Sequence, residues 1–212
     1  MDALTNQKTT TKQNNITTIF FDVGGVMVVD YVDHKVLDLA EKYDKDPDLM
    51  LHLRKKYRVL ADMGQISDKE FWQKVLETVN VTAVEDDWKF ESYEEKIEGG
   101  IEIAEQLKQQ GYRIAVLSND SKQSSDYRRQ KYNFDSLFDD AIFSYQYGII
   151  KPEPKLFEIA LKKLKVAPDQ SVFIDDRLEN ITASERIGIH SILFKNSKQL
   201  IGELGRLGVM ET

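Results

Sequence analysis

The chain has 212 residues, of which 41% are hydrophobic and 31% are charged, and this length suits one domain or one core with a smaller inserted module. The formal net charge is -7, and an acidic chain without a basic cluster is a poor candidate for binding nucleic acid or an anionic membrane surface. The absence of cysteine excludes disulfides, thiolate metal sites and cysteine nucleophiles.

The N-terminal residues 1–15 are polar and lack the apolar stretch of a secretory signal, so we expect a flexible tail. No apolar run approaches the roughly 18 residues that predict a membrane span. We therefore expect a soluble, cytoplasmic protein with no membrane partner and no nucleic-acid partner.

Strand-like and helix-like segments alternate along most of the chain. Residues 16–29 are apolar except near Asp22 and a glycine pair, as is typical of a strand in a central parallel sheet. Further strands are predicted over residues 113–118, 141–144, 171–174 and 190–194. Helical spacing of apolar residues predicts helices over residues 101–110, 154–165 and 178–187. This alternation predicts an α/β fold with a doubly wound parallel sheet.

Residues 31–97 interrupt the alternation, because they are charged, helical in pattern and contain no convincing strand. Ser67 and Glu70 have the spacing of a capping box, and Asp46 before Pro47 predicts another helix start. We interpret this segment as an all-helical cap inserted over the sheet. The α/β core would then comprise residues 16–30 and 98–212.

Polar side chains stand where the predicted strands end, the edge at which open parallel sheets bind ligands. In chain order they are Asp22, Ser118, Asn119, Lys151, Asp175 and Asp176. Carboxylate oxygens can hold Mg²⁺, and an ammonium and a hydroxyl can offset the repulsion between a carboxylate nucleophile and a phosphoryl group. The set therefore suits chemistry through an acyl phosphate.

Four ordered motifs carry a resemblance to a known family. They are Asp22-Val23-Gly24-Gly25-Val26, Leu117-Ser118-Asn119, Lys151-Pro152 and Phe173-Ile174-Asp175-Asp176. Together they resemble the haloacid dehalogenase superfamily, and more narrowly its phosphatase-like members with a helical cap between the first and second motifs. Each motif is weak by itself, but four in order, with a helical segment in the expected gap, are specific. The resemblance covers nearly the whole chain past residue 15.

The resemblance implies a Rossmann-like core and a Mg²⁺-dependent phosphatase of a small phosphorylated metabolite, for which a sugar phosphate is one candidate. It implies that Asp22 is the nucleophile, forms an aspartyl-phosphate and is also a Mg²⁺ ligand. Ser118 and Asn119 would contact the phosphoryl group, and Lys151 would stabilise it.

The same resemblance implies the remaining metal ligands. Asp176 would be the main ligand from the fourth motif, and the carbonyl oxygen of Gly24 would be another. Asp175 is expected to contact the metal through a water molecule or to support its direct ligands, because adjacent strand residues point to opposite faces. Asn180 would support the same site.

Gly24 departs from the family pattern, in which most phosphatases carry a second aspartate two residues after the nucleophile as general acid. Loss of general acid–base catalysis costs about 10²–10⁴-fold, which implies a slow enzyme. The proton could come from the substrate, from water, or from Asp30, Asp33 or His34 at the start of the helical segment.

Two alternative functions stay open. The missing acid at Gly24 favours a non-catalytic or very slow module of the same fold that binds a phospho-ligand or a protein. A 2-haloacid dehalogenase-type hydrolase is the other, and the pair Asp175-Asp176 argues against it. We interpret residues 55–58 as a solvated helix face, and Asp120 or Ser121 as a helix N-cap.

Overall fold

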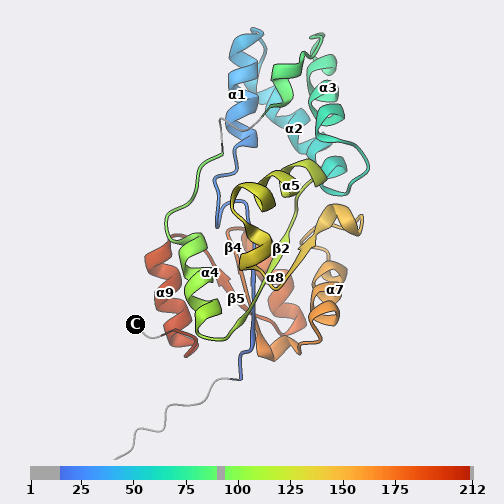
Figure 1. Cartoon of the computed structure of the whole chain (residues 1–212). Coiled ribbons are helices and arrows are strands. Elements are labelled where there is room, and N and C mark those ends of the chain that lie inside the picture. Colours follow the sequence, from blue (N-terminus) through green and yellow to red (C-terminus); the bar gives the residue numbers. More distant parts are fainter. Residues whose placement is uncertain (1–14, 90–93, 211–212) are drawn as a thin grey trace, which may run out of the picture.

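The computed structural model describes residues 15–89 and 94–210, so the predicted N-terminal tail lies outside the described residues except for residue 15. Within the described part, five parallel strands form one sheet in the order β3-β2-β1-β4-β5. Figure 1 shows this sheet with helices on both sides. The strands are β1 (Thr18–Phe21), β2 (Arg113–Ser118), β3 (Asp140–Phe143), β4 (Ser171–Asp175) and β5 (His190–Leu193). The predicted doubly wound parallel sheet is confirmed.

Helices cover both faces of this sheet because its strands are apolar on both faces. On β1, Ile19 and Phe21 pack with α4, α6 and α9, whereas Phe20 packs on the opposite face with α7 and α8. These helices and their neighbours are α4 (Gly100–Gln109), α5 (Lys122–Lys131), α6 (Phe134–Leu137), α7 (Pro154–Leu164), α8 (Leu178–Ile187) and α9 (Ser197–Arg206), with the short 3₁₀ turns η2 (Ser144–Gln146) and η3 (Pro168–Gln170).

The first predicted strand is shorter than its apolar sequence indicated. β1 ends at Phe21, and the chain then folds back, with the backbone N–H groups of Met27 and Val28 donating to the carbonyl of Val23. Gly25 adopts φ +75°, a conformation that side-chain-bearing residues rarely take, and so permits this turn. The apolar residues beyond Asp22 are therefore buried in a turn and not in the sheet.

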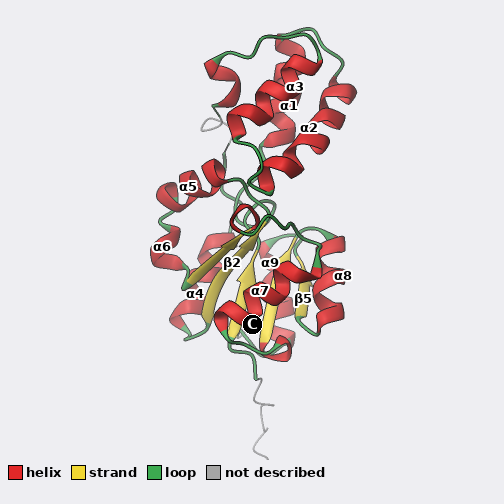
Figure 2. Ribbon diagram, turned by 90° about the vertical axis from the view of Figure 1, so that its right-hand side faces the viewer, coloured by secondary structure: helices red, strands yellow, loops and turns green. Residues whose placement is uncertain are grey.

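Residues 31–89 contain α1 (Val32–Lys42), α2 (Pro47–Asp62), α3 (Asp68–Thr78) and the short η1 (Glu85–Trp88), which we call the helical module. The capping box of Ser67 and Glu70 is present, and Asp46 caps α2. The module has its own apolar cluster around Phe71 and Trp72, and it lies beyond one end of the sheet (Figure 2). None of the described helices is long and apolar enough to cross a membrane.

Two helical glycines provide a matched test of this packing. A Cβ on Gly100 would lie 2.4 Å from the carbonyl oxygen of Val26, whereas a Cβ on Gly202 would meet nothing within 4 Å. We expect Gly100→Ala to destabilise the protein by about 1–3 kcal/mol through overpacking. Gly202→Ala should instead stabilise α9 by roughly 0.5–1 kcal/mol. Urea unfolding measures both, and equal effects would contradict the packing described for Gly100.

Candidate active site

Parallel register brings the polar strand ends together. Phe21 in β1 pairs with Val116 of β2 on one side and with Ile174 of β4 on the other. Asp22, the residue after β1, therefore lies between the ends of β2 and β4. The end residues of those strands are Ser118 and Asp175.

Lys151 lies at the centre of this group, with its side chain fully buried. Its Nζ contacts Asp22 Oδ2 at 2.9 Å and Asp175 Oδ2 at 2.7 Å, and donates to the carbonyl of Leu117 at 2.9 Å. Asn119 fixes the backbone of Lys151 twice, because its Nδ2 donates to the Lys151 carbonyl at 2.9 Å and its Oδ1 accepts from the Lys151 N–H at 2.7 Å. The ammonium is thus held between two carboxylates.

Asp22 is buried beside this ammonium. Its Oδ1 accepts hydrogen bonds from Ser118 Oγ and from the backbone N–H of Val23, both at 2.7 Å. Burial raises the pKa of Asp22 to about 7; the positive charge of Lys151 opposes this shift, and the negative charge of Asp175 adds to it. The hydrogen bonds and the charge of Lys151 therefore do not fully compensate Asp22 for its burial.

Asp175 is also buried, but its pKa shifts in the opposite direction. Burial by itself would raise the pKa, and the charge and hydrogen bond of Lys151, with further donors, outweigh it and hold the pKa below its usual value. The further donors are the backbone N–H of Arg177 at 2.8 Å and the Asn180 amide, 3.0 Å from both carboxylate oxygens. Asn180 therefore supports the site, at Asp175.

Asp176 completes an acidic cluster, in which one carboxylate oxygen each from Asp22, Asp175 and Asp176 lie within 4.8 Å of one another. β4 ends at Asp175 and Asp176 lies just outside it, so the strand alternation on which their expected separation rested does not extend to Asp176. A Cβ on Gly25 would lie 2.3 Å from Asp176 Oδ2, so glycine leaves the space that this carboxylate occupies. Burial and the neighbouring Asp175 raise the pKa of Asp176.

These oxygen donors fit a hard divalent cation such as Mg²⁺. The raised pKa values of Asp22 and Asp176 indicate negative charge that the described residues do not fully compensate. The oxygens of Asp175, by contrast, already accept from Lys151, Asn180 and the Arg177 N–H. The donor set is consistent with Asp22 and Asp176 as direct ligands, with Asp175 in support.

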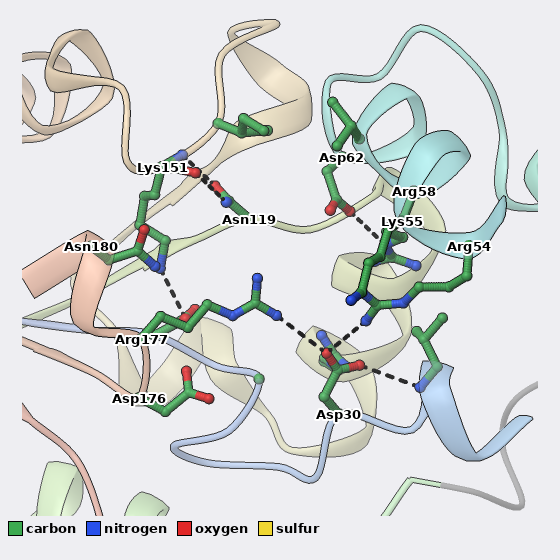
Figure 3. Close-up of a pocket in the computed structure, with 16 residues that line it drawn as sticks. Asp30, Arg54, Lys55, Arg58, Asp62, Asn119, Lys151, Asp176, Arg177 and Asn180 are labelled. Atoms are coloured by element: carbon green, nitrogen blue, oxygen red, sulfur yellow. Dashed lines mark hydrogen bonds and ion pairs between the residues drawn. The ribbon is translucent and has the colours of Figure 1, made fainter. Parts of the chain in front are cut away.

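A cavity of about 240 Å³ opens above this cluster, between the strand ends and α2 (Figure 3). Its strand-end wall includes Asp22, Gly24 and Lys151, and its helical wall includes Arg54 and Asp62. The mixture of cationic and anionic walls suits a small, polar, anionic ligand.

Of the three alternative proton donors at the start of the helical segment, Asp30 lines this cavity and Asp33 and His34 do not. Asp30 Oδ2 lies 3.2 Å from Arg54 Nη2 and 3.6 Å from Arg177 Nη2. Burial raises the pKa of Asp30, but the charges of Arg54 and Arg58 outweigh it and the pKa falls below its usual value. Asp30 is therefore an ionised partner of arginines.

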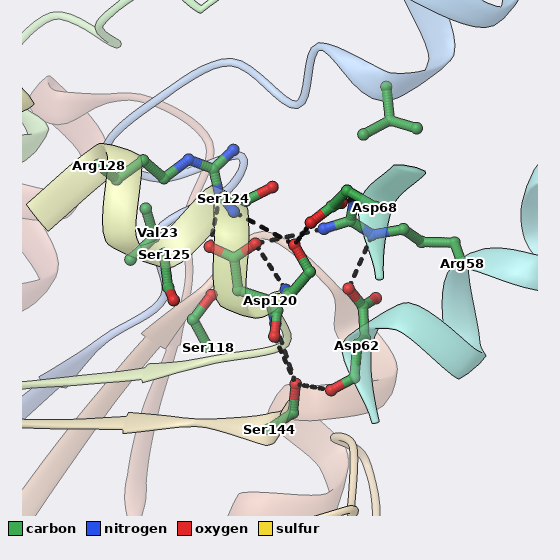
Figure 4. A network of polar contacts seen from close by, with 12 residues as sticks. Val23, Arg58, Asp62, Asp68, Ser118, Asp120, Ser124, Ser125, Arg128 and Ser144 are labelled. Carbon is green, nitrogen blue, oxygen red and sulfur yellow. Dashed lines mark hydrogen bonds and ion pairs between the residues drawn. The ribbon is translucent and has the colours of Figure 1, made fainter. Parts of the chain in front are cut away.

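Sequence reasoning missed a buried ionic network behind the cavity (Figure 4). Arg58, interpreted as part of a solvated face, is buried and contacts Asp62 at 2.7 Å, Asp120 at 3.2 Å and Asp68 at 3.4 Å. Asp120 also contacts Arg128 of α5 at 2.7 Å. The only sequence signal was the four-residue spacing of Arg58 and Asp62, which places them on one helix face.

The N-cap prediction next to this network is confirmed for one of its two candidates. Ser121 caps α5, because its Oγ accepts from the backbone N–H of Ser124. Asp120 instead directs its carboxylate into the ionic network.

The family model for haloacid dehalogenase-like hydrolases matches residues 16–188. The chain belongs to this hydrolase family. Over 111 residues, the chain is 30% identical to bifunctional epoxide hydrolase 2 of Rattus norvegicus; the match covers 50% of this chain and 20% of that protein. It is 26% identical over 108 residues to glyceraldehyde 3-phosphate phosphatase of Pyrococcus furiosus, covering 45% of it. The matches thus span less than half the length of these curated relatives.

Solved structures of this family share the fold. A haloacid dehalogenase family enzyme of Bacteroides thetaiotaomicron matches with a TM-score of 0.71 and 18% identity, over 85% of this chain and 94% of that one. A second structure of that enzyme, in complex with magnesium and inorganic phosphate, matches with a TM-score of 0.66 and 19% identity, over 85% and 95% of the two chains. At this identity the likeness shows a common fold.

The opposite pKa shifts of the two buried acids predict opposite effects of neutralising them in metal-free protein. Asp22→Asn removes a poorly compensated charge and should raise Tm by about 2–8 °C, equivalent to roughly 1–2 kcal/mol. Asp175→Asn leaves the Lys151 ammonium with weaker compensation and should cost about 3 kcal/mol or more. Thermal unfolding in EDTA measures both, and a lower Tm for Asp22→Asn would contradict the charge balance described.

Proposed function

We propose that this hydrolase is a Mg²⁺-dependent phosphatase that acts on a small phosphorylated metabolite through a phosphoryl group carried on Asp22. The observation that carries the proposal is the position of Asp22, which lies at the floor of the cavity within contact of Lys151 and beside the carboxylates of Asp175 and Asp176. The names of the Pyrococcus phosphatase and of the Bacteroides complex with magnesium and phosphate support it.

Asp22, Asp176 and the carbonyl oxygen of Gly24 would hold Mg²⁺, with Asp175 in a supporting role. When bound, the cation supplies positive charge that offsets the repulsion between the Asp22 carboxylate and a phosphoryl dianion. It would also compensate the buried charge of Asp22 and favour its ionised, nucleophilic form.

Different residues of the chain would then carry out different parts of phosphoryl transfer. One Asp22 oxygen attacks phosphorus while the bond to the leaving oxygen breaks, and water later cleaves the acyl phosphate to release inorganic phosphate and restore Asp22. Lys151 neutralises charge on the transferring group, and Ser118 Oγ is placed to donate to it. Asn119, which holds the Lys151 backbone, can direct its remaining amide proton into the cavity.

We propose further that the helical module acts as the cap of this active site. Its helix α2 contributes Arg54, Arg58 and Asp62 to the cavity lining. Substrate selection would depend on these side chains, because they face the region where the leaving group of a phosphate ester would lie. The core would consist of residues 16–30 and 98–212, as expected from the sequence.

The first test is release of inorganic phosphate from p-nitrophenyl phosphate with Mg²⁺ and with EDTA. This aryl leaving group needs no proton, so the assay is insensitive to the missing acid at Gly24. We expect turnover with Mg²⁺ and its loss in EDTA. Asp22→Asn should lower kcat by at least about 10³-fold while the circular dichroism spectrum stays native.

The controls separate the alternatives. Turnover that persists in EDTA, or in Asp22→Asn, would contradict the proposal. Release of halide from a 2-haloacid, without release of phosphate from the ester, would instead support the alternative that the protein is a 2-haloacid dehalogenase-type hydrolase. Binding of a phosphate ester with no turnover would support a binding module.

Gly24→Asp tests whether the missing acid limits the reaction. A Cβ on Gly24 would meet nothing within 4 Å, so the cavity accepts a side chain there. We expect this variant to raise kcat/KM for ethyl phosphate more than that for p-nitrophenyl phosphate, because only an alkoxide needs a proton as it leaves. Equal changes for the two esters would count against an acid role at this position.

A further inference from the structure

Cleavage of an alkyl phosphate requires a proton donor for the leaving oxygen, and Gly24 has no side chain to provide one. In an in-line displacement the leaving oxygen departs from the side of phosphorus opposite the attacking carboxylate. Asp22 attacks from the strand-end wall of the cavity. The donor should therefore belong to the opposite wall, which α2 helps to form.

Three side chains on or beside the helical wall could carry a transferable proton. Asp30 is held between Arg54 and Arg177, which keep it ionised. Lys55 is exposed to solvent. All three line the same cavity as Asp22, and Asp62 differs from the other two because its side chain is only 14% exposed.

The carboxyl group of Asp62 has one engaged and one free oxygen. Its Oδ1 lies 2.7 Å from Arg58 Nε, and no hydrogen bond or ion pair to another described residue engages Oδ2. Figure 3 shows this carboxyl group next to the Arg58 guanidinium on the helical side of the cavity. The free oxygen is the one that can bear a proton.

Asp62 is also the point at which α2 is tied to the sheet. Ser144, directly after β3, donates from Oγ to the Asp62 carbonyl at 2.6 Å, and the same Oγ accepts from the Asp120 N–H at 3.0 Å. Two residues further on, a Cβ on Gly64 would lie 2.7 Å from the carbonyl oxygen of Tyr145, so the chain here rests directly on the core. The position of Asp62 relative to the strand ends is thus fixed by the core itself.

We propose that Asp62 is the general acid of this enzyme and stands in for the acid that Gly24 lacks. The inference rests on the proposed phosphatase function. As Asp22 forms its bond to phosphorus, the phosphorus–oxygen bond of the ester breaks, and the leaving oxygen takes the bond's electron pair and the proton of Asp62. The Asp62 carboxylate then takes a proton from the water that attacks phosphorus, and the electron pair of the acyl phosphate bond returns to Asp22. Both aspartates are restored, and the products are an alcohol and inorganic phosphate.

The electrostatic surroundings of Asp62 supply the proton near neutral pH. Burial raises its pKa to about 6; Arg58 opposes the shift, and the carboxylates of Asp120 and Asp68 add to it. The charged groups that act on it are Arg58 of α2, Asp68 of α3 and Asp120 before α5. The other charged residues that line the cavity are Asp22, Asp30, Arg54, Lys55, Arg128, Lys151, Asp176 and Arg177. A general acid with a pKa near the working pH both holds and releases a proton effectively.

The test compares two leaving groups in Asp62→Asn, which keeps an oxygen for Arg58 to contact. Below pH about 6, where Asp62 is protonated, we expect kcat/KM for ethyl phosphate to fall about 10²-fold, and that for p-nitrophenyl phosphate to change less than about threefold. Asp30→Asn is the matched control, because it alters another carboxylate of the same cavity and should affect both esters alike. Adding Gly24→Asp to Asp62→Asn should recover most of the ethyl phosphate activity.

The pH dependence of activity distinguishes an acid role of Asp62 from a purely structural role, which would not alter it. The ratio of wild-type to Asp62→Asn activity on ethyl phosphate should be largest below pH about 6 and fall toward one above it, since Asp62 is then deprotonated. Titration of Asp22 and of the substrate is common to both proteins and cancels in this ratio. If Asp62→Asn does not fold, the variants Asp62→Glu and Asp62→Gln replace it, because their side chains have nearly the same size. We then expect activity on ethyl phosphate only in Asp62→Glu, whose side chain can carry a proton.

The outcomes separate this inference from the function on which it rests. The acid role would be overturned, and the phosphatase function left intact, if the wild-type enzyme turned over p-nitrophenyl phosphate but Asp62→Asn lost equal activity on both esters. Unchanged ethyl phosphate turnover would overturn it as well. Absence of turnover of either ester by the wild-type enzyme would refute the proposed function itself, and the inference with it.

Discussion

The structure of the site depends on one buried ammonium, that of Lys151, placed between Asp22 and Asp175. Three parallel strands bring carboxylates and a hydroxyl to one edge, and without a cation there the acids would repel one another in a medium of low polarity. Lys151, with the Arg177 N–H and the Asn180 amide, outweighs the burial of Asp175, whereas it compensates Asp22 only in part, as their opposite pKa shifts indicate. That unequal division leaves Asp22 with a buried charge that is only partly compensated and that a bound cation would stabilise.

A second set of buried charges connects the helical module to the core. Arg58 and Arg128 share Asp120, so that α2 and α5 meet through one carboxylate. Such networks contribute little to net stability compared with apolar packing, but breaking one partner is costly. These networks therefore suit a place where the position of one element relative to another matters more than their contribution to the free energy of unfolding. Here they fix the helical wall at the distance from the strand ends that leaves a small cavity.

Much of the core and of the strand-end set was predictable, because both depend on local patterns. Apolar runs locate the strands, and parallel pairing then brings their ends together. What the sequence did not predict depends on distant partners. Arg58 looked solvated because its partner Asp120 is 62 residues away, and the different surroundings of Asp175 and Asp176 depend on the residue at which β4 stops. The division into core and cap, and the roles of the site residues, stay predictions.

The most direct test of the account is to look for the phosphoryl group on Asp22. A phosphate ester radiolabelled at phosphorus would be mixed with the enzyme and Mg²⁺, the reaction stopped in acid during turnover, and the peptides of an acidic pepsin digest separated and identified by mass spectrometry. The account predicts a label on the peptide that contains Asp22, lost on a chase with unlabelled ester and absent in EDTA. Rapid release of phosphate with no label on that peptide at any time would contradict it.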